Sequence, residues 1–114
     1  MNILDVYHGT KGDDILTIIK RGVLRPNKSG EIYFVQHDVT GAMQYGVDES
    51  RMACYAIRVR VEVPLTATME QLERSGAPRD TLRVTTPLPI KAEVTEMYIR
   101  TPGQAQLRTI KGTS

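Results

Sequence analysis

An alternation of apolar and polar side chains predicts the strands of this chain. It is clearest over residues 55–63, where every second residue is apolar: Tyr55, Ile57, Val59, Val61 and Val63. A period of two is typical of a strand with one face in the core and one in solvent. Shorter apolar segments at residues 3–7, 31–35, 82–85 and 92–99 predict further strands.

The segment at residues 92–99 is predicted to form a C-terminal β-hairpin with residues 105–110, because Thr101-Pro102-Gly103 is a turn sequence. Strict alternation along residues 92–99 places Glu93 and Glu96 on opposite faces of the strand. Neither face is clearly the more apolar. Periodicity alone therefore leaves open which of the two carboxylates faces a functional site.

A first short helix is predicted over residues 13–22. Two acids stand at its start, bases stand at its end, and its isoleucines share one face. Asp13 or Asp14 is the expected N-cap, and Gly22 is the expected C-terminal cap.

Two further short helices are predicted from capping residues. Asp38 is expected to cap a helix that passes through Ala42 and Tyr45 and ends at Gly46. The sequence Thr-Met-Glu-Gln at the start of residues 68–76 matches a capping box, and a glycine closes that segment.

These elements predict a single domain over residues 1–114, which is one domain by length. Residues 47–51 are predicted to be a loop. Tight turns and alternating strands favour an antiparallel sheet over a doubly wound one. The expected class is therefore α+β and β-rich, with two or three short helices.

Composition restricts the function classes. The net charge of +2 is too small to indicate nucleic-acid binding by itself, and a mixed charged surface is expected. Cys54 is the only cysteine, so a cysteine metal cluster is excluded, and it is predicted to be a small core residue. No signal peptide and no apolar segment of membrane-spanning length is present, so a cytoplasmic location without a membrane partner is expected.

The candidate chemistry begins at His8-Gly9-Thr10, at the end of the first predicted strand. Gly9 allows a ligand to approach the backbone closely, because it has no Cβ. Phosphate-binding glycine loops, HExxH and Gly-x-Ser-x-Gly are all absent from the sequence. The remaining candidates are Tyr33, Tyr45 and one of the two late glutamates.

In order along the chain, these residues form a series of motifs. The chain resembles the poly(ADP-ribose) polymerase-like ADP-ribosyltransferases, whose signature is His-Tyr-Glu. The matching segments are His8-Gly9-Thr10, the helix that leads into Gly22-Val23-Leu24, Ile32-Tyr33-Phe34-Val35, Ala42-Met43-Gln44-Tyr45, Glu96-Met97-Tyr98-Ile99 and Gln104. Glu31 stands inside the Gly-Ile-Tyr-Phe motif of the family.

The resemblance implies a split antiparallel sheet with NAD, as substrate, in the cleft between its halves. It implies that His8 binds the adenosine ribose and that the Gly9 backbone holds the nicotinamide carboxamide, beside Thr10. Tyr33 and Tyr45 would flank the nicotinamide ring.

The resemblance further implies that Glu96 is the catalytic carboxylate, with His8 and Tyr33, and that no metal takes part. Glu96 would bind the 2′-hydroxyl of the nicotinamide ribose. A carboxylate there stabilises the oxocarbenium-like sugar that develops when the glycosidic bond breaks. Neutral nicotinamide is the leaving group, so no general acid is needed.

The expected function is mono-ADP-ribosyl transfer to a protein or RNA acceptor, as the toxin end of a bacterial effector. Such an effector would be delivered into a target cell and could meet an immunity protein. One alternative is an NAD-dependent RNA 2′-phosphotransferase, a family with Tyr-His-Gly-Thr at the matching place. A second alternative is an inactive module that binds NAD or ADP-ribose.

Overall fold

The computed structural model describes residues 2–72, 80–101 and 108–111, which form one antiparallel sheet with two α-helices. The elements are β1 (Asn2–Gly9), α1 (Gly12–Arg21), β2 (Val23–Leu24), β3 (Glu31–Val35), α2 (Val39–Met43), β4 (Val47–Asp48), a 3-10 turn (Glu49–Arg51), β5 (Ala53–Val63), β6 (Thr68–Gln71), β7 (Thr81–Thr85), β8 (Ile90–Arg100) and β9 (Arg108–Lys111). The β-rich α+β class is therefore confirmed.

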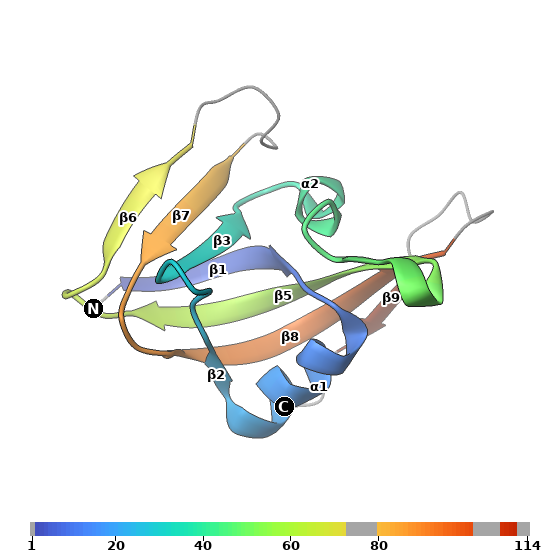
Figure 1. Cartoon of the computed structure of the whole chain (residues 1–114), viewed down its shortest axis with the longest axis horizontal. Helices are drawn as coiled ribbons and strands as arrows, with labels where there is room; N and C mark the ends of the chain where they lie inside the picture. The colour runs from blue at the N-terminus through green and yellow to red at the C-terminus, as the bar shows by residue number, and fades with distance from the viewer. Residues whose placement is uncertain (1, 73–79, 102–107, 112–114) are drawn as a thin grey trace.

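The strands are ordered β2-β8-β5-β1-β3-β7-β6, with β4 on β5 and β9 on β8. Figure 1 shows β5 and β8 running through the centre while β6 and β7 cross their direction at a steep angle. β1 pairs with β5 from Asn2 to Gly9, but its register with β3 is the single pair Tyr7–Val35. Two groups of strands thus meet at one narrow seam between β1 and β3.

Helix α1 forms because its apolar side chains share one face, and Ile15 and Ile18 are buried there. Gly22 caps its end in the left-handed conformation, with φ of 69° and a bond from its amide to the Ile18 carbonyl. The predicted N-cap is wrong. The helix begins at Gly12 after Lys11, so both acids lie in the first turn, where the helix dipole interacts favourably with negative charge.

Helix α2 confirms Asp38 as an N-cap, because its carboxylate accepts a hydrogen bond of 3.0 Å from the Thr40 amide. The helix itself is only five residues long and ends at Met43. Tyr45 therefore follows the helix, with its amide bonded to the Ala42 carbonyl.

The helix predicted from the capping box is wrong. Residues 68–71 form strand β6, which pairs with β7 over its whole length. Glu70 lies opposite Arg83 and forms an ion pair with it, so cross-strand contacts outweigh a weak local capping signal. Gly76 lies outside the described residues.

Residues 47–51 also differ from the prediction of a loop, since β4 pairs with β5 and a 3-10 turn follows. The hairpin of β8 with β9 is confirmed, although residues 102–107 lie outside the described part.

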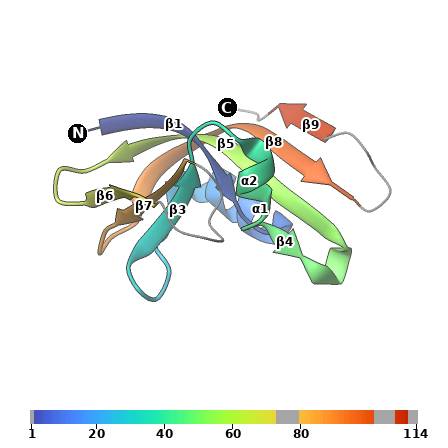
Figure 2. The same ribbon diagram turned by 90° about the horizontal axis from the view of Figure 1, so that it is seen from above.

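Buried apolar side chains form a cluster on each face of the sheet. The larger joins α1 to β5 and β8, through residues that include Ile15, Ile57 and Val59. The smaller joins α2 to the other face, through Ala42, Met43, Val35, Ala56 and Tyr98, and half-buried Cys54 packs against it. Figure 2 shows the sheet from above, with both helices near its middle.

A bulge in β8 changes which residues share a face. Register partners are Arg58 with Glu96 and Arg60 with Glu93, and the register shifts between residues 58 and 59. Thr95 is the extra residue, and its hydroxyl donates to the Arg58 carbonyl. Glu93 and Glu96 consequently lie on the same face, which corrects their expected separation.

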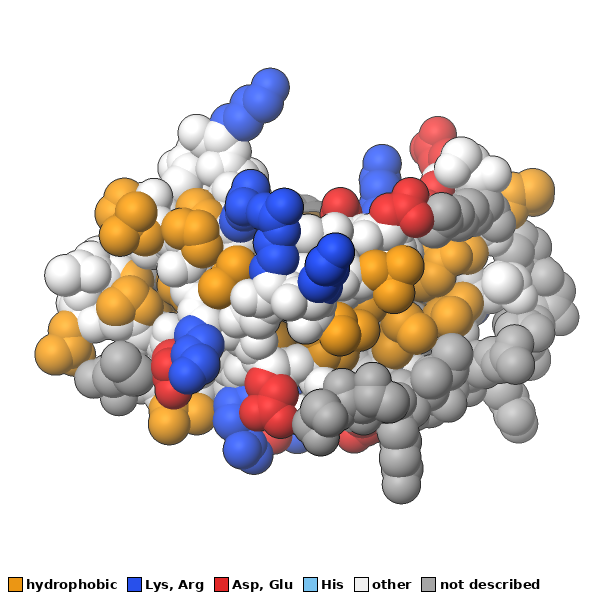
Figure 3. All heavy atoms as spheres, turned by 90° about the horizontal axis from the view of Figure 1, so that it is seen from below, with side chains coloured by type: hydrophobic (Ala, Val, Ile, Leu, Met, Phe, Trp, Pro, Cys, Tyr) orange, Lys and Arg blue, Asp and Glu red, His pale blue; other side chains and the backbone are white. Residues whose placement is uncertain are grey.

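Within the described residues, no helix is long and apolar enough to cross a membrane. Figure 3 shows basic side chains lying close to acidic ones, with apolar side chains between them, on the face seen from below.

Candidate functional site

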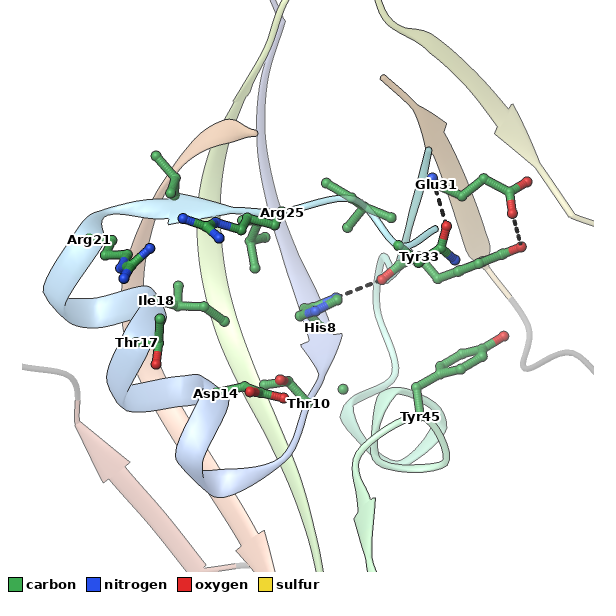
Figure 4. A pocket seen from close by; sticks show the side chains of 15 residues that line it. His8, Thr10, Asp14, Thr17, Ile18, Arg21, Arg25, Glu31, Tyr33 and Tyr45 are labelled. Carbon is green, nitrogen blue, oxygen red and sulfur yellow. Dashed lines mark hydrogen bonds between the residues drawn. The ribbon is translucent and has the colours of Figure 1, made fainter. Parts of the chain in front are cut away.

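A pocket of about 450 Å³ lies beside the seam, between α1 and β2 on one side and β3 and the end of α2 on the other. Figure 4 shows His8 in the middle, Tyr33 and Tyr45 on one side, and Arg21 and Arg25 on the other. Gly9 and Thr10 also line it, so the pocket brings together five of the six predicted site residues. The sixth, Glu96, is not among the lining residues.

The pocket exists because the ladder between β1 and β3 ends at Tyr7–Val35. Two residues further, Gly9 would lie opposite Tyr33. The Thr10 amide donates to the Tyr55 carbonyl, so alternation turns the Gly9 backbone groups away from β5 and toward β3.

The same alternation applies to β3. The Thr86 amide donates to the Gly30 carbonyl, which turns the Tyr33 backbone groups away from β7 and toward β1. The backbone polar groups of Gly9 and Tyr33 therefore both point into the gap where the strands diverge.

The half-buried His8 ring lies at this gap, and its Nδ1 is 2.8 Å from the Tyr33 carbonyl oxygen. A carbonyl oxygen only accepts, so Nδ1 carries the proton and donates. Burial is the main cause that lowers the pKa of His8 below 6.5, so the ring is neutral at pH 7. Nε2 is then a hydrogen-bond acceptor, available to a hydroxyl in the pocket.

Tyr33 and Tyr45 form the aromatic side of the pocket. Their rings are nearly parallel, with 5.9 Å between centroids and an interplanar angle of 15°. A planar ring inserted between them needs roughly 7 Å, twice the optimum carbon–carbon contact of about 3.5 Å. Tyr45 is 41% exposed and sits outside α2, so a small outward shift of this ring opens the space.

Gly9 is required by a close crossing of chain segments. A Cβ at this position would lie 1.9 Å from the Ala42 carbonyl oxygen and 2.8 Å from the Tyr45 Cβ. The absence of a side chain thus lets the end of α2 pack on β1 and sets the position of Tyr45.

Tyr33 is held by a carboxylate that sequence analysis did not select. Its hydroxyl donates to Glu31 Oε1 at 3.1 Å, and Arg83 Nη1 lies 3.4 Å from Glu31 Oε2. Arg83 also pairs with Glu70. Glu31 and Asp14 are the carboxylates that line the pocket among the described residues.

Glu96 lies on the opposite face of the sheet from His8. Glu96 is in register with Arg58, which is in register with Tyr7, whereas the neighbouring His8 is in register with Ile57. Glu96 accepts a hydrogen bond of 2.6 Å from the Tyr98 hydroxyl. Glu96 is not among the residues that line the pocket, so the structure does not bring it together with them.

Other lining residues were missed by sequence analysis. Arg21 and Arg25 flank the Gly22 cap, and Glu31 stands two residues before Tyr33, so it shares a strand face with that ring. The position of Glu31 inside the Gly-Ile-Tyr-Phe motif was the available signal.

Comparison with protein-family models, curated proteins and solved structures found no match for this chain. Among the described residues, no group of three or more His, Cys, Asp and Glu side chains is placed to hold a metal ion.

Proposed function

We propose that this chain binds NAD in the pocket beside the seam, releases nicotinamide and transfers ADP-ribose to an acceptor. The observation that carries the proposal is the pocket itself, which gathers His8, Gly9, Tyr33 and Tyr45 from segments far apart in the sequence. These are the residues that the resemblance to His-Tyr-Glu ADP-ribosyltransferases selects.

The aromatic pair suits the nicotinamide end of NAD. Oxidised nicotinamide in NAD is a pyridinium cation, and aromatic faces attract cations by roughly 0.5–2 kcal/mol. Tyr33 and Tyr45 present two nearly parallel faces to one inserted ring. Contact is weaker after cleavage, because free nicotinamide is neutral, and this favours product release.

Backbone groups suit the carboxamide. The amide and carbonyl of Gly9 point toward the gap, and a primary carboxamide offers one acceptor and two donors to such a pair. The acceptor at His8 Nε2 suits a ribose hydroxyl, which is a donor. Both features depend on the end of the β1–β3 ladder.

Cleavage breaks the bond between C1′ and the nicotinamide nitrogen, and the electron pair leaves with nicotinamide. The acceptor then attacks C1′ and releases its proton to solvent water. A carboxylate beside the ribose stabilises the developing positive charge. We assign this role to Glu31, because it lines the pocket at the outer end of the Tyr33 ring.

The test is nicotinamide release from NAD, with the acceptor supplied as a crude cell extract and labelled NAD. Glu31→Gln is expected to lower the rate by roughly 10²–10³-fold while leaving NAD affinity within a few-fold. Glu96→Gln is the matched control, because it makes the same change at a glutamate that does not line the pocket. Full activity of Glu31→Gln together with loss in Glu96→Gln would return the role to Glu96.

A second candidate function is a module that binds NAD or ADP-ribose without turnover. The observation that favours it is that Glu96, the glutamate of the predicted signature, does not line the pocket. NAD binding that requires Tyr33, with no nicotinamide release in any extract, would select this function.

A further inference from the structure

The pocket has a second, cationic side that the proposed function does not use. Arg21 is in the last turn of α1 and Arg25 follows β2, and both line the pocket across from the tyrosines. Both side chains are exposed, and among the described residues no carboxylate forms an ion pair with either.

Asn27 adds a neutral donor on this side. Its side-chain oxygen already accepts from the Ser29 amide at 2.9 Å and the Glu31 amide at 3.0 Å. These two bonds fix the amide group in the loop, so its NH2 is the group left for a ligand in the pocket it lines.

Two guanidinium groups and an amide donor on one side of a pocket are the chemistry that recognises phosphate oxygens. We infer that Arg21, Arg25 and Asn27 form an anion subsite for the diphosphate of a nucleoside diphosphate. The inference rests on the proposed NAD site and deepens it. It makes the preferred ligand a diphosphate-bridged dinucleotide rather than a nicotinamide nucleoside.

The acidic groups in the pocket do not cancel this subsite. Glu31 is engaged by Arg83 and Tyr33, on the aromatic side. Asp14 lies in the first turn of α1, so the side of the pocket formed by α1 and β2 has one carboxylate against two arginines among its lining residues. The arginine side therefore keeps a net positive potential toward the cavity.

The experiment is calorimetric titration of the chain with ADP, with adenosine and with pyrophosphate, none of which carries nicotinamide. ADP is expected to bind at least tenfold more tightly than adenosine. Arg21→Gln with Arg25→Gln is expected to remove that advantage. Lys20→Gln is the matched control, because it removes one positive charge from the same helical turn without lining the pocket.

Equal affinities for ADP and adenosine would overturn the inference, and so would equal effects of Lys20→Gln and the arginine variants. Saturating NAD is expected to displace pyrophosphate. Pyrophosphate that binds together with NAD would assign the arginines to an acceptor phosphate instead and overturn the assignment to the nucleotide.

The subsite and the proposed function fail separately. Arginine-dependent binding of ADP with no NAD cleavage would retain the subsite and reject the transferase. NAD cleavage that is unaffected by Arg21→Gln and Arg25→Gln would retain the transferase and reject the subsite.

Discussion

Two polar clusters lie on opposite faces of the same central strands and differ in what their polar groups contact. In the pocket, His8 Nε2, the Gly9 backbone and two arginines face a cavity. On the other face, Arg58 binds Asp5 and the Tyr7 hydroxyl, and Tyr98 binds Glu96. We call this second group, Asp5, Tyr7, Arg58, Glu96 and Tyr98, the Tyr98 cluster.

Members of the Tyr98 cluster form hydrogen bonds with one another, and its rings pack together. Tyr7 and Tyr98 meet edge to face with centroids 5.8 Å apart, and Arg58 lies 5.3 Å from the Tyr7 ring centroid. The contact with Asp5 raises the pKa of Arg58, and burial raises that of Tyr98. A cluster closed on itself stabilises the fold, whereas groups that face a cavity are available to a ligand.

The largest expected effect is the loss of stability when the Tyr98 cluster loses its central ring. Tyr98 is 9% exposed and packs against α2, so Tyr98→Ala is expected to lower the free energy of unfolding by about 3 kcal/mol. Tyr98→Phe keeps the ring and is expected to cost only about 1 kcal/mol, for the lost bond to Glu96. Both are measured by urea unfolding. An unchanged midpoint for Tyr98→Ala would contradict a structural role.

A smaller effect is expected from Gly9→Ala, which affects both stability and NAD binding. The new methyl group collides with the Ala42 carbonyl, so α2 must shift, at a cost of about 2 kcal/mol. Tyr45 moves with it, and NAD binding measured by calorimetry is expected to be lost. Gly22→Ala is the control, since its cost of about 1 kcal/mol comes from the positive φ alone. Loss of NAD binding in Gly22→Ala as well would show that the loss in Gly9→Ala does not come from the collision with Ala42.

The smallest expected effect is a pH dependence of the pocket on the acidic side of pH 6.5. Because the pKa of His8 is lowered in the fold, its contribution to stability is present above pH 6.5 and is lost as pH falls through the folded-state value. Protonation also removes the acceptor at Nε2, so NAD affinity is expected to fall over the same range. A His8→Gln variant with the same pH profile as the wild type would show that another group titrates.

The sequence predicts the central strands well because one face of each is buried. The 55–63 alternation falls within β5, and residues 31–35 are β3 without change. Residues 68–71 were misassigned because a strand at a sheet edge, with all four side chains exposed, has no apolar face to reveal it. Its conformation comes from pairing with β7, which the local sequence pattern does not reveal.

Only part of the site was predicted, because some of its determinants leave no pattern in the sequence. His8, Tyr33 and Tyr45 stand in short motifs, and the pocket does gather them. The bulge at Thr95 leaves no mark in the alternation, so the face of Glu96 could not be read from periodicity. The arginines were hidden because exposed basic residues at a helix end are common on any protein surface.

The single Tyr7–Val35 pairing also has a consequence for laboratory evolution. If the pairing of β1 with β3 continued, Gly9 and Tyr33 would hydrogen-bond to each other and their backbone groups would no longer face the pocket. A screen for heat resistance alone would then reward closure, whereas a screen that also demands ligand capture would preserve the opening. If variants selected for heat resistance still left Gly9 and Tyr33 unpaired, that would indicate that the protein uses the opening.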